Sequence, residues 1–209
     1  MHHLDRTSVS EPSCLPRLRS NARRSNRWDW KDATDQDRGD ISCALTTMQN
    51  GRCAYCEAIL SDDKHIEHFR PRNAGHGHQG FPQKMFDWDN LFLSCTAHDH
   101  CGQFKDSGKP GSYSPDDLLN PCIDHPERML CFKSSGEVCA GNGLSVIDQK
   151  KAETSIRLLG LNCPALREHR RNTLRKWMEM FKGLGGMSDK ELESALLNES
   201  FPTAIRQNL

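Results

Sequence analysis

Two pairs of cysteines constrain the fold of this chain more strongly than any other feature of its sequence. Cys53 and Cys56 are separated by two residues, a spacing at which one tight turn presents two thiolates to a single metal ion. Cys95 and Cys101 form a second pair after a long insertion. Four thiolates suit a closed tetrahedral zinc site, in which the metal holds the fold together and does no chemistry. We therefore predict that these cysteines bind one structural Zn²⁺.

The fourth zinc ligand has an alternative in the sequence. His98 follows Cys95 at the same two-residue spacing, and His100 is adjacent to Cys101. A histidine in a polar loop is more often solvated than bound to a metal. The sequence therefore favours Cys101 and leaves His98 as the alternative.

Side chains typical of a hydrolytic site lie between the two cysteine pairs. They are His65, Glu67, His68 and Asn90. A neutral histidine can take a proton from water near physiological pH, which a carboxylate of ordinary pKa does poorly. Hard divalent ions such as Mg²⁺ and Mn²⁺ prefer carboxylate oxygen, so Glu67 is the natural ligand for a second, catalytic ion.

Four motifs in this order, CAYCE, HIEHFRPR, WDNLFLSC and CGQFK, resemble those of the HNH endonucleases. Within that family they are similar to the subgroup found beside bacterial retrons and in Septu-type antiphage systems, where the nuclease works with an ABC-type ATPase. The opening MHHLDR, the approach ISCALTTMQNGRCAYC and the late segment LGLNCPALREHR also fit the subgroup. The resemblance covers most of positions 1–182 and not the tail beyond.

The resemblance implies a role for each residue of the site. His68 would be the general base, and Asn90 would orient that base or hold its loop. Glu67 would bind Mg²⁺ or Mn²⁺. Arg70 would hold the scissile phosphate, and Lys105 would do the same or stabilise the pentacoordinate charge.

The chain departs from the HNH pattern after the second cysteine pair, where many relatives carry an Asn or His ligand and this chain carries Gly102. The second ligand of the catalytic ion is therefore open, and His65 is a candidate. In a regular strand His65 and Glu67 share one face, whereas His68 faces the other way. A bulge or strand end near Phe69-Arg70 must turn His68 toward the metal, or one assignment is wrong.

The order of elements predicts an α+β fold built on a zinc-stapled ββα-metal (HNH) finger, with flanking helices and a helical C-terminal part. The finger consists of extended segments at 65–69 and 88–93 and a helix from 101 to 105. Its hairpin is too small to be stable alone, so the zinc supplies the missing stabilisation. Apolar spacing predicts helices at 41–48, 148–159 and 164–182, and a hairpin turns at Ser135-Gly136. The predicted units are a basic and acidic arm (1–40), the nuclease core (41–110), a hairpin with packed helices (111–182), and a flexible break with a short helical tail (183–209).

The charge of the chain is balanced overall but uneven along its length. Lys plus Arg equals Asp plus Glu at 28 each, which counts against tight unaided binding to nucleic acid. Positions 17–31 are basic, and Arg23, Arg24 and Arg27 could bind phosphate while Trp28 or Trp30 stacks on a base. The alternative is a solvated arm whose tryptophans pack on the protein's own core, and whose charge is neutralised by the aspartates that follow.

Two C-terminal segments have both a structural and a binding interpretation. The helix at 164–182 carries an apolar stripe and a basic remainder (Arg167, Arg170, Arg171, Arg175 and Lys176), which is solvated or binds nucleic acid or an acidic partner. A capping box at Ser188–Glu191 opens a short helix. Beyond it Phe201, Ile205 and Leu209 fall four residues apart, which indicates either a frayed terminus or a segment that docks the ATPase.

Location and function follow from these observations as expectations. With no long apolar run, no apolar leader and ten irregularly spaced cysteines, we expect a cytoplasmic protein with no membrane contact. The cysteines outside the two pairs, at 14, 43, 122, 131, 139 and 163, are predicted to be free thiols. The function is either a metal-dependent nuclease that acts as a toxic defence effector or a zinc-stapled adaptor that docks the ATPase or a nucleoprotein without catalysis. The partners that the resemblance implies are an ABC-type ATPase of the same system and a retron reverse transcriptase–nucleic-acid complex. DNA is the family's default substrate, and structured RNA, including tRNA, is the alternative.

Overall fold

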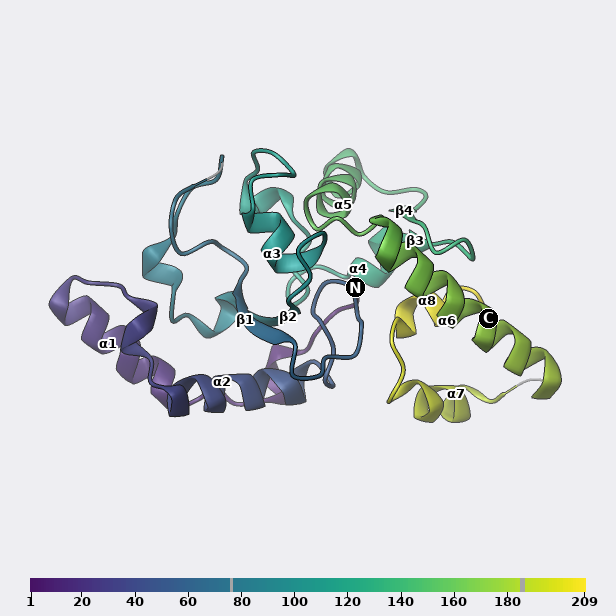
Figure 1. Cartoon of the computed structure of the whole chain (residues 1–209), viewed down its shortest axis with the longest axis horizontal. Coiled ribbons are helices and arrows are strands. Elements are labelled where there is room, and N and C mark those ends of the chain that lie inside the picture. The colour runs from purple at the N-terminus through teal and green to yellow at the C-terminus, as the bar shows by residue number, and fades with distance from the viewer. Residues whose placement is uncertain (76, 185–186) are drawn as a thin grey trace.

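The computed structural model describes residues 1–75, 77–184 and 187–209, and these form a mixed α+β structure with small sheets (Figure 1). Two helices, α1 (Cys14–Ser25) and α2 (Asp35–Met48), lie at one end of the molecule. The strands β1 (Lys64–His68) and β2 (Leu91–Cys95) and the helix α3 (Cys101–Asp106) form the middle. The remaining elements lie at the other end: α4 (Pro126–Met129), β3 (Leu130–Phe132), β4 (Val138–Ala140), α5 (Val146–Leu158), α6 (Pro164–Leu184), α7 (Asp189–Leu196) and α8 (Pro202–Arg206).

The central hairpin has the predicted order of strand, loop, strand and helix. β1 and β2 pair antiparallel in a continuous register from Lys64–Cys95 to His68–Leu91. The second extended segment begins later than predicted, because residues 88–90 form a turn of 3₁₀ helix and β2 starts at Leu91. Asn90 therefore lies at the entrance to the strand and not within it.

The approach to the first cysteine pair follows its local sequence signals. Thr34 and Asp37 form a capping box that opens α2, six residues earlier than the predicted start of the helix at 41. Ile41, Leu45 and Met48 are buried at helical spacing, as predicted. The helix ends at Met48, and Asn50 and Gly51 just beyond it both have positive φ, so the predicted Asn-Gly turn is confirmed.

The C-terminal half contains the predicted hairpin and helices. β3 and β4 pair antiparallel around Gly136, and α5 and α6 follow. One residue of the predicted basic face is not solvated. Arg170 is 1% exposed, donates hydrogen bonds to the Gly136 and Leu161 carbonyls, and lies over the Phe132 ring. The sequence interpretation of Arg170 was wrong because its partners come from segments that local spacing does not reveal.

The C-terminal tail packs on the chain itself. The Ser188–Glu191 capping box is confirmed and opens α7. Two residues of the apolar line, which the sequence left open between a frayed terminus and a docking segment, belong to the protein's own core: Phe201 and Ile205 are 1% and 0% exposed. The third, Leu209, is 39% exposed. The Arg52 guanidinium fixes this segment by donating to the carbonyls of residues 196, 197 and 199. The predicted flexible break includes residues 185–186, which lie outside the described residues.

Within the described ranges, none of the helices has the length and apolar character needed to cross a membrane.

Candidate functional site

The two cysteine pairs meet in one cluster, as predicted. The sulfurs of Cys53, Cys56, Cys95 and Cys101 all lie within 4.8 Å of one another. Cys53 Sγ and Cys101 Sγ are 3.7 Å apart, close to the ~3.8 Å between two sulfurs bonded tetrahedrally to one zinc ion. Cys101 has a φ of 61°, an uncommon conformation for a residue with a side chain. Donor set and spacing therefore fit a metal such as zinc.

For the fourth position, the geometry favours Cys101 over His98. His98 is exposed, whereas the Cys101 sulfur is buried within the cluster. His100 lies beside the cluster, with its Nδ1 3.1 Å from Cys101 Sγ and 3.6 Å from Cys95 Sγ. A ring N–H in this position stabilises thiolate charge without binding the metal.

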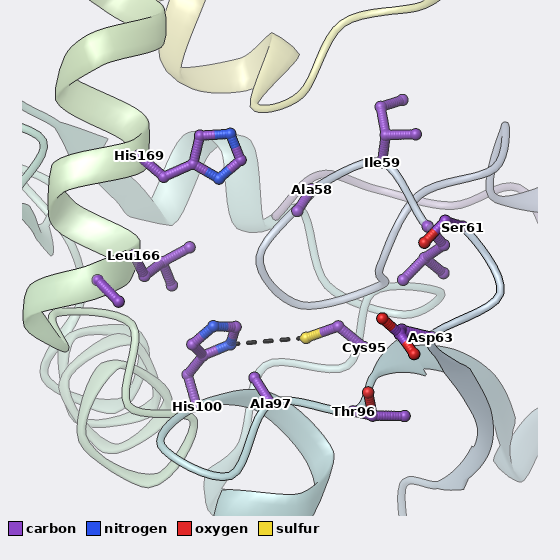
Figure 2. A pocket seen from close by; sticks show the side chains of 12 residues that line it. Ala58, Ile59, Ser61, Asp63, Cys95, Thr96, Ala97, His100, Leu166 and His169 are labelled. Carbon is purple, nitrogen blue, oxygen red and sulfur yellow. Dashed lines mark hydrogen bonds between the residues drawn. The ribbon is translucent and has the colours of Figure 1, made fainter.

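One side of the cysteine cluster borders a cleft of about 390 Å³. Figure 2 shows the Cys95 sulfur directed at the His100 ring, with Leu166 and His169 of α6 on one side of the cleft and Ile59 on the other. Cys53, Cys56 and Cys101 are buried, and Cys95 is partly exposed. A metal ion in the cluster is therefore approachable by solvent only near Cys95, as far as the described residues show.

A buried ion pair lies beside the cluster, on the face of the hairpin that α3 covers. Glu67 is 3% exposed, and its Oε1 is 3.0 Å from Lys105 Nζ while its Oε2 is 3.3 Å from His65 Nε2. The ammonium of Lys105 also contacts Asp106 and Tyr113. Burial opposes the charged carboxylate, but the charges of Lys105 and His65 together lower the pKa of Glu67 to about 2.

This arrangement brings His65 and Glu67 together as predicted but does not fit a divalent ion bound between them. The Lys105 ammonium already neutralises the carboxylate at hydrogen-bonding distance and has no exposed surface. A divalent ion at Glu67 would meet that positive charge at close range, and strong repulsion would follow. The Glu67 carboxylate also fills the space beside Gly102, because a Cβ at position 102 would lie 2.4 Å from Glu67 Oε2.

His68 lies on the opposite side of the hairpin from this ion pair. The register of β1 is regular through His68, so the described hairpin contains no bulge before this residue. The strand end that we gave as the alternative falls at His68 itself and leaves its side chain on the face away from Glu67. Its Nε2 donates to the Met85 carbonyl at 3.0 Å, and its ring meets Trp30 edge to face with 4.7 Å between centroids. Burial, and then the charge of Arg72, lower the pKa of His68 to about 3. The ring is therefore neutral at physiological pH, with its lone pair on Nδ1.

Asn90 connects the segments around His68. Its Oδ1 accepts from the Arg70 N–H at 2.7 Å, and its Nδ2 donates to the carbonyls of Arg70 and Lys84. These bonds suit the loop-holding role that the resemblance implies, which stays a prediction. The Arg70 side chain is paired with Asp116 and lies over the Phe81 ring.

Two residues near His68 were missed at the sequence level. Arg72 lies over the Trp30 ring and is the cation that lowers the pKa of His68 most, and Trp30 meets the His68 ring edge to face. The sequence signal for Arg72 was the Arg-Pro-Arg motif at 70–72, which places a second arginine close to His68 in the chain. Trp30 could not be assigned to His68, because only the folded chain brings the two together.

The basic arm is largely occupied by contacts within the chain. Trp28 and Trp30 both stack on Phe86, which supports core packing over base stacking. Arg27 pairs with Asp32, and Arg24 donates to Asn21. Arg23, Arg24 and Arg27 are exposed on or just after α1, and their role in binding nucleic acid stays a prediction.

Comparison with known proteins relates this chain to two proteins named Septu protein PtuB and to one retron protein. No protein-family model matches it. It is 32% identical over 146 residues to the Septu protein PtuB of Bacillus mycoides (60% of this chain, 48% of the relative), and 28% identical over 127 residues to that of Bacillus thuringiensis (58% and 41%). It is 26% identical over 143 residues to the "Retron Vc95 putative HNH endonuclease" of Vibrio cholerae (66% and 65%). The matched region thus spans about half or less of each Septu relative. The predicted resemblance to Septu-type proteins and to a retron HNH endonuclease is confirmed.

Proposed function

We propose that this protein is an HNH nuclease that hydrolyses phosphodiester bonds in nucleic acid as an effector of Septu- or retron-type antiphage defence. The observation that carries the proposal is the antiparallel hairpin and following helix around four clustered cysteines, with His68 at the end of β1. The relatives named PtuB and retron HNH endonuclease support the same assignment.

His68 is the general base in this proposal. Its Nε2–H bond to the Met85 carbonyl fixes the ring, which leaves Nδ1 to take the proton from the attacking water. The water oxygen bonds to phosphorus as the bond to the leaving oxygen breaks, and solvent protonates that oxygen. A bound phosphate raises the pKa of His68 because its negative charge favours the imidazolium. The raised pKa of His68 then lies closer to physiological pH, at which the ring must accept the proton.

The other site residues position the substrate and the base. Asn90 holds residues 70 and 84 around His68 through three hydrogen bonds. Arg70 and Arg72 supply positive charge for the scissile phosphate. The four clustered cysteines would hold a zinc ion, which would tie the hairpin to α3 and take no part in the chemistry. Because the Glu67 carboxylate is already paired with the Lys105 ammonium, we assign no step to a divalent ion bound there.

The substrate and partners extend the proposal. DNA is the default substrate, with RNA, including tRNA, as the alternative. We expect an ABC-type ATPase of the same system as partner, and a reverse transcriptase–nucleic-acid complex where the system is a retron.

A non-catalytic adaptor is the second candidate, and a specific observation favours it. His68 is only 6% exposed, and the Glu67 carboxylate is fully paired inside the protein. A site closed in this way suits a zinc-stapled scaffold that docks its ATPase or a nucleoprotein without catalysis.

The test is incubation of zinc-loaded protein with total cellular DNA and RNA, with and without the ATPase. Parallel reactions contain Mg²⁺, Mn²⁺ or a chelator too weak to strip the cysteine cluster. Cleavage of either nucleic acid supports the nuclease, and the substrate that disappears identifies its class. If both nucleic acids stay intact under every condition while the ATPase binds, the adaptor is correct.

A further inference from the structure

A second group of metal-binding side chains lies beside the cysteine cluster. Asp99 and His100 precede α3, and Cys163 immediately precedes α6. One donor atom from each of these three residues lies within 4.8 Å of the others. We propose that Asp99, His100 and Cys163 bind a second divalent transition-metal ion, of which Zn²⁺ is the expected occupant.

The two segments that carry these ligands are held against each other by the backbone. The Cys101 N–H donates to the Leu159 carbonyl at 2.8 Å, which joins the two segments. Within the second segment, the Cys163 N–H donates to the Gly160 carbonyl at 2.9 Å and closes the turn that carries Cys163. Gly160 has a φ of 56°, and a Cβ there would lie 2.6 Å from the Asp99 carbonyl oxygen. Glycine at 160 thus permits a close approach that a side chain would prevent, and this approach places Cys163 beside Asp99 and His100.

The two nitrogens of His100 have different neighbours. Nδ1 faces the sulfurs of Cys101 and Cys95, which leaves Nε2 for the second ion. Nε2 is 3.9 Å from Asp99 Oδ1, whereas two such ligands on one tetrahedral zinc ion lie ~3.4 Å apart. The Asp99 side chain is 56% exposed, so it can move by the difference without disturbing the core.

The chemistry of the ligands selects the ion. One carboxylate oxygen, one imidazole nitrogen and one thiolate sulfur suit Zn²⁺ or Co²⁺, and they do not suit Mg²⁺ or Ca²⁺. The three donors among the described residues leave a fourth position for water or another ligand. Because Asp99 is exposed and must move, we expect weaker binding here than at the cysteine cluster.

The second ion would connect the segment before α3, which carries Asp99 and His100, to the segment before α6, which carries Cys163. His100 would bind it through Nε2 while donating Nδ1–H to thiolates of the first site. Cys163 would join the turn between α5 and α6 to the finger. The assignment does not depend on nuclease activity, and its readout is metal content alone.

The experiment uses the full chain with its cysteine cluster filled by Zn²⁺ and weakly bound ions removed by a mild chelator. Titration with Co²⁺ should give one further equivalent, with the visible bands of tetrahedral cobalt and a near-ultraviolet thiolate charge-transfer band. Elemental analysis then counts both ions per chain. Cys163→Ser should lose the charge-transfer band, and Cys163→Ser and Asp99→Asn should each weaken the second equivalent by at least about tenfold. Both should keep the first zinc.

Cys43→Ser is the matched control, because Cys43 is an exposed thiol on α2. It should bind both equivalents as the wild type does. Two results would overturn the proposal: a wild-type chain that takes up no second ion, or a second equivalent that Cys163→Ser and Asp99→Asn leave unchanged.

Discussion

Substitution of Gly102 by alanine tests the packing beside the metal cluster. A Cβ at this position would lie 2.4 Å from Glu67 Oε2 and 2.6 Å from Glu67 Cδ. The carboxylate cannot yield freely, because Lys105 Nζ and His65 Nε2 hold it at 3.0 Å and 3.3 Å. Gly102→Ala must therefore displace a buried ion pair.

The magnitude follows from the two interactions that change. Overpacking a buried site costs about 1–3 kcal/mol, and removing one partner of a buried ion pair costs about 3–5 kcal/mol. Glu67 is displaced and not removed, and Asp106 stays 2.6 Å from Lys105 Nζ. We therefore expect a loss of about 2–4 kcal/mol in the free energy of unfolding, which for a chain of this size lowers Tm by about 4–16 °C.

The assay is thermal unfolding of zinc-loaded protein, with two further variants. Gly39→Ala is the matched control, since a Cβ at position 39 of α2 has no atom of the described chain within 4 Å. It should stabilise the protein by about 0.5–1 kcal/mol. Glu67→Asp shortens the side chain, so in the Gly102→Ala background it should restore stability with a coupling energy of about 1–3 kcal/mol. If Gly102→Ala melts with the wild type, or if Glu67→Asp rescues nothing, Glu67 does not lie where the structure places it.

Three further predictions concern pH, the tail and zinc. Stability should fall as the pH drops from 6.5, where unfolded His68 gains a proton, toward about 3, where folded His68 does so; Glu67 adds a second loss between 4.5 and about 2. When the free energy of unfolding is measured at a series of pH values, His68→Gln should lack the fall between pH 6.5 and about 3, and Glu67→Gln should lack the fall between pH 4.5 and about 2. Profiles unchanged from the wild type would contradict both assignments. Arg52→Ala leaves three tail carbonyls without their donor, so it should cost about 2–4 kcal/mol and make residues 197–209 sensitive to limited proteolysis, unlike the exposed control Arg24→Ala. Cys53→Ser and Cys101→Ser should lose zinc and solubility together, whereas zinc loss in His98→Ala would show that the fourth ligand is wrong.

Features with a local signal could be predicted from the sequence. The spacing within each cysteine pair, the apolar repeat of Ile41, Leu45 and Met48, and the Asn50-Gly51 turn all depend on neighbouring residues. The capping box at Ser188 depends on a residue three positions away. Each of these features depends on residues a few positions apart in the chain, so the sequence alone could predict it. The structure contains all of them.

Features that depend on distant segments could not be predicted. Arg170 is buried because it reaches a carbonyl 34 residues earlier, and Arg52 holds carbonyls up to 147 residues later. We predicted Glu67 as a ligand of a divalent ion from the chemistry of its carboxylate. The sequence around Glu67 gives no sign that Lys105 packs against it. Phe201 and Ile205 looked unsupported because the surface that they cover belongs to other parts of the chain.

The most direct test of the proposed function compares nucleic-acid cleavage by wild type, His68→Ala and His98→Ala, each with verified zinc content and melting temperature. His98 is an exposed histidine and serves as the control. If His68 is the general base, His98→Ala should cleave at the wild-type rate and His68→Ala should be slower by about 10²–10⁴-fold while keeping its zinc and fold. A folded, zinc-loaded His68→Ala protein that cleaves at the wild-type rate would contradict the account.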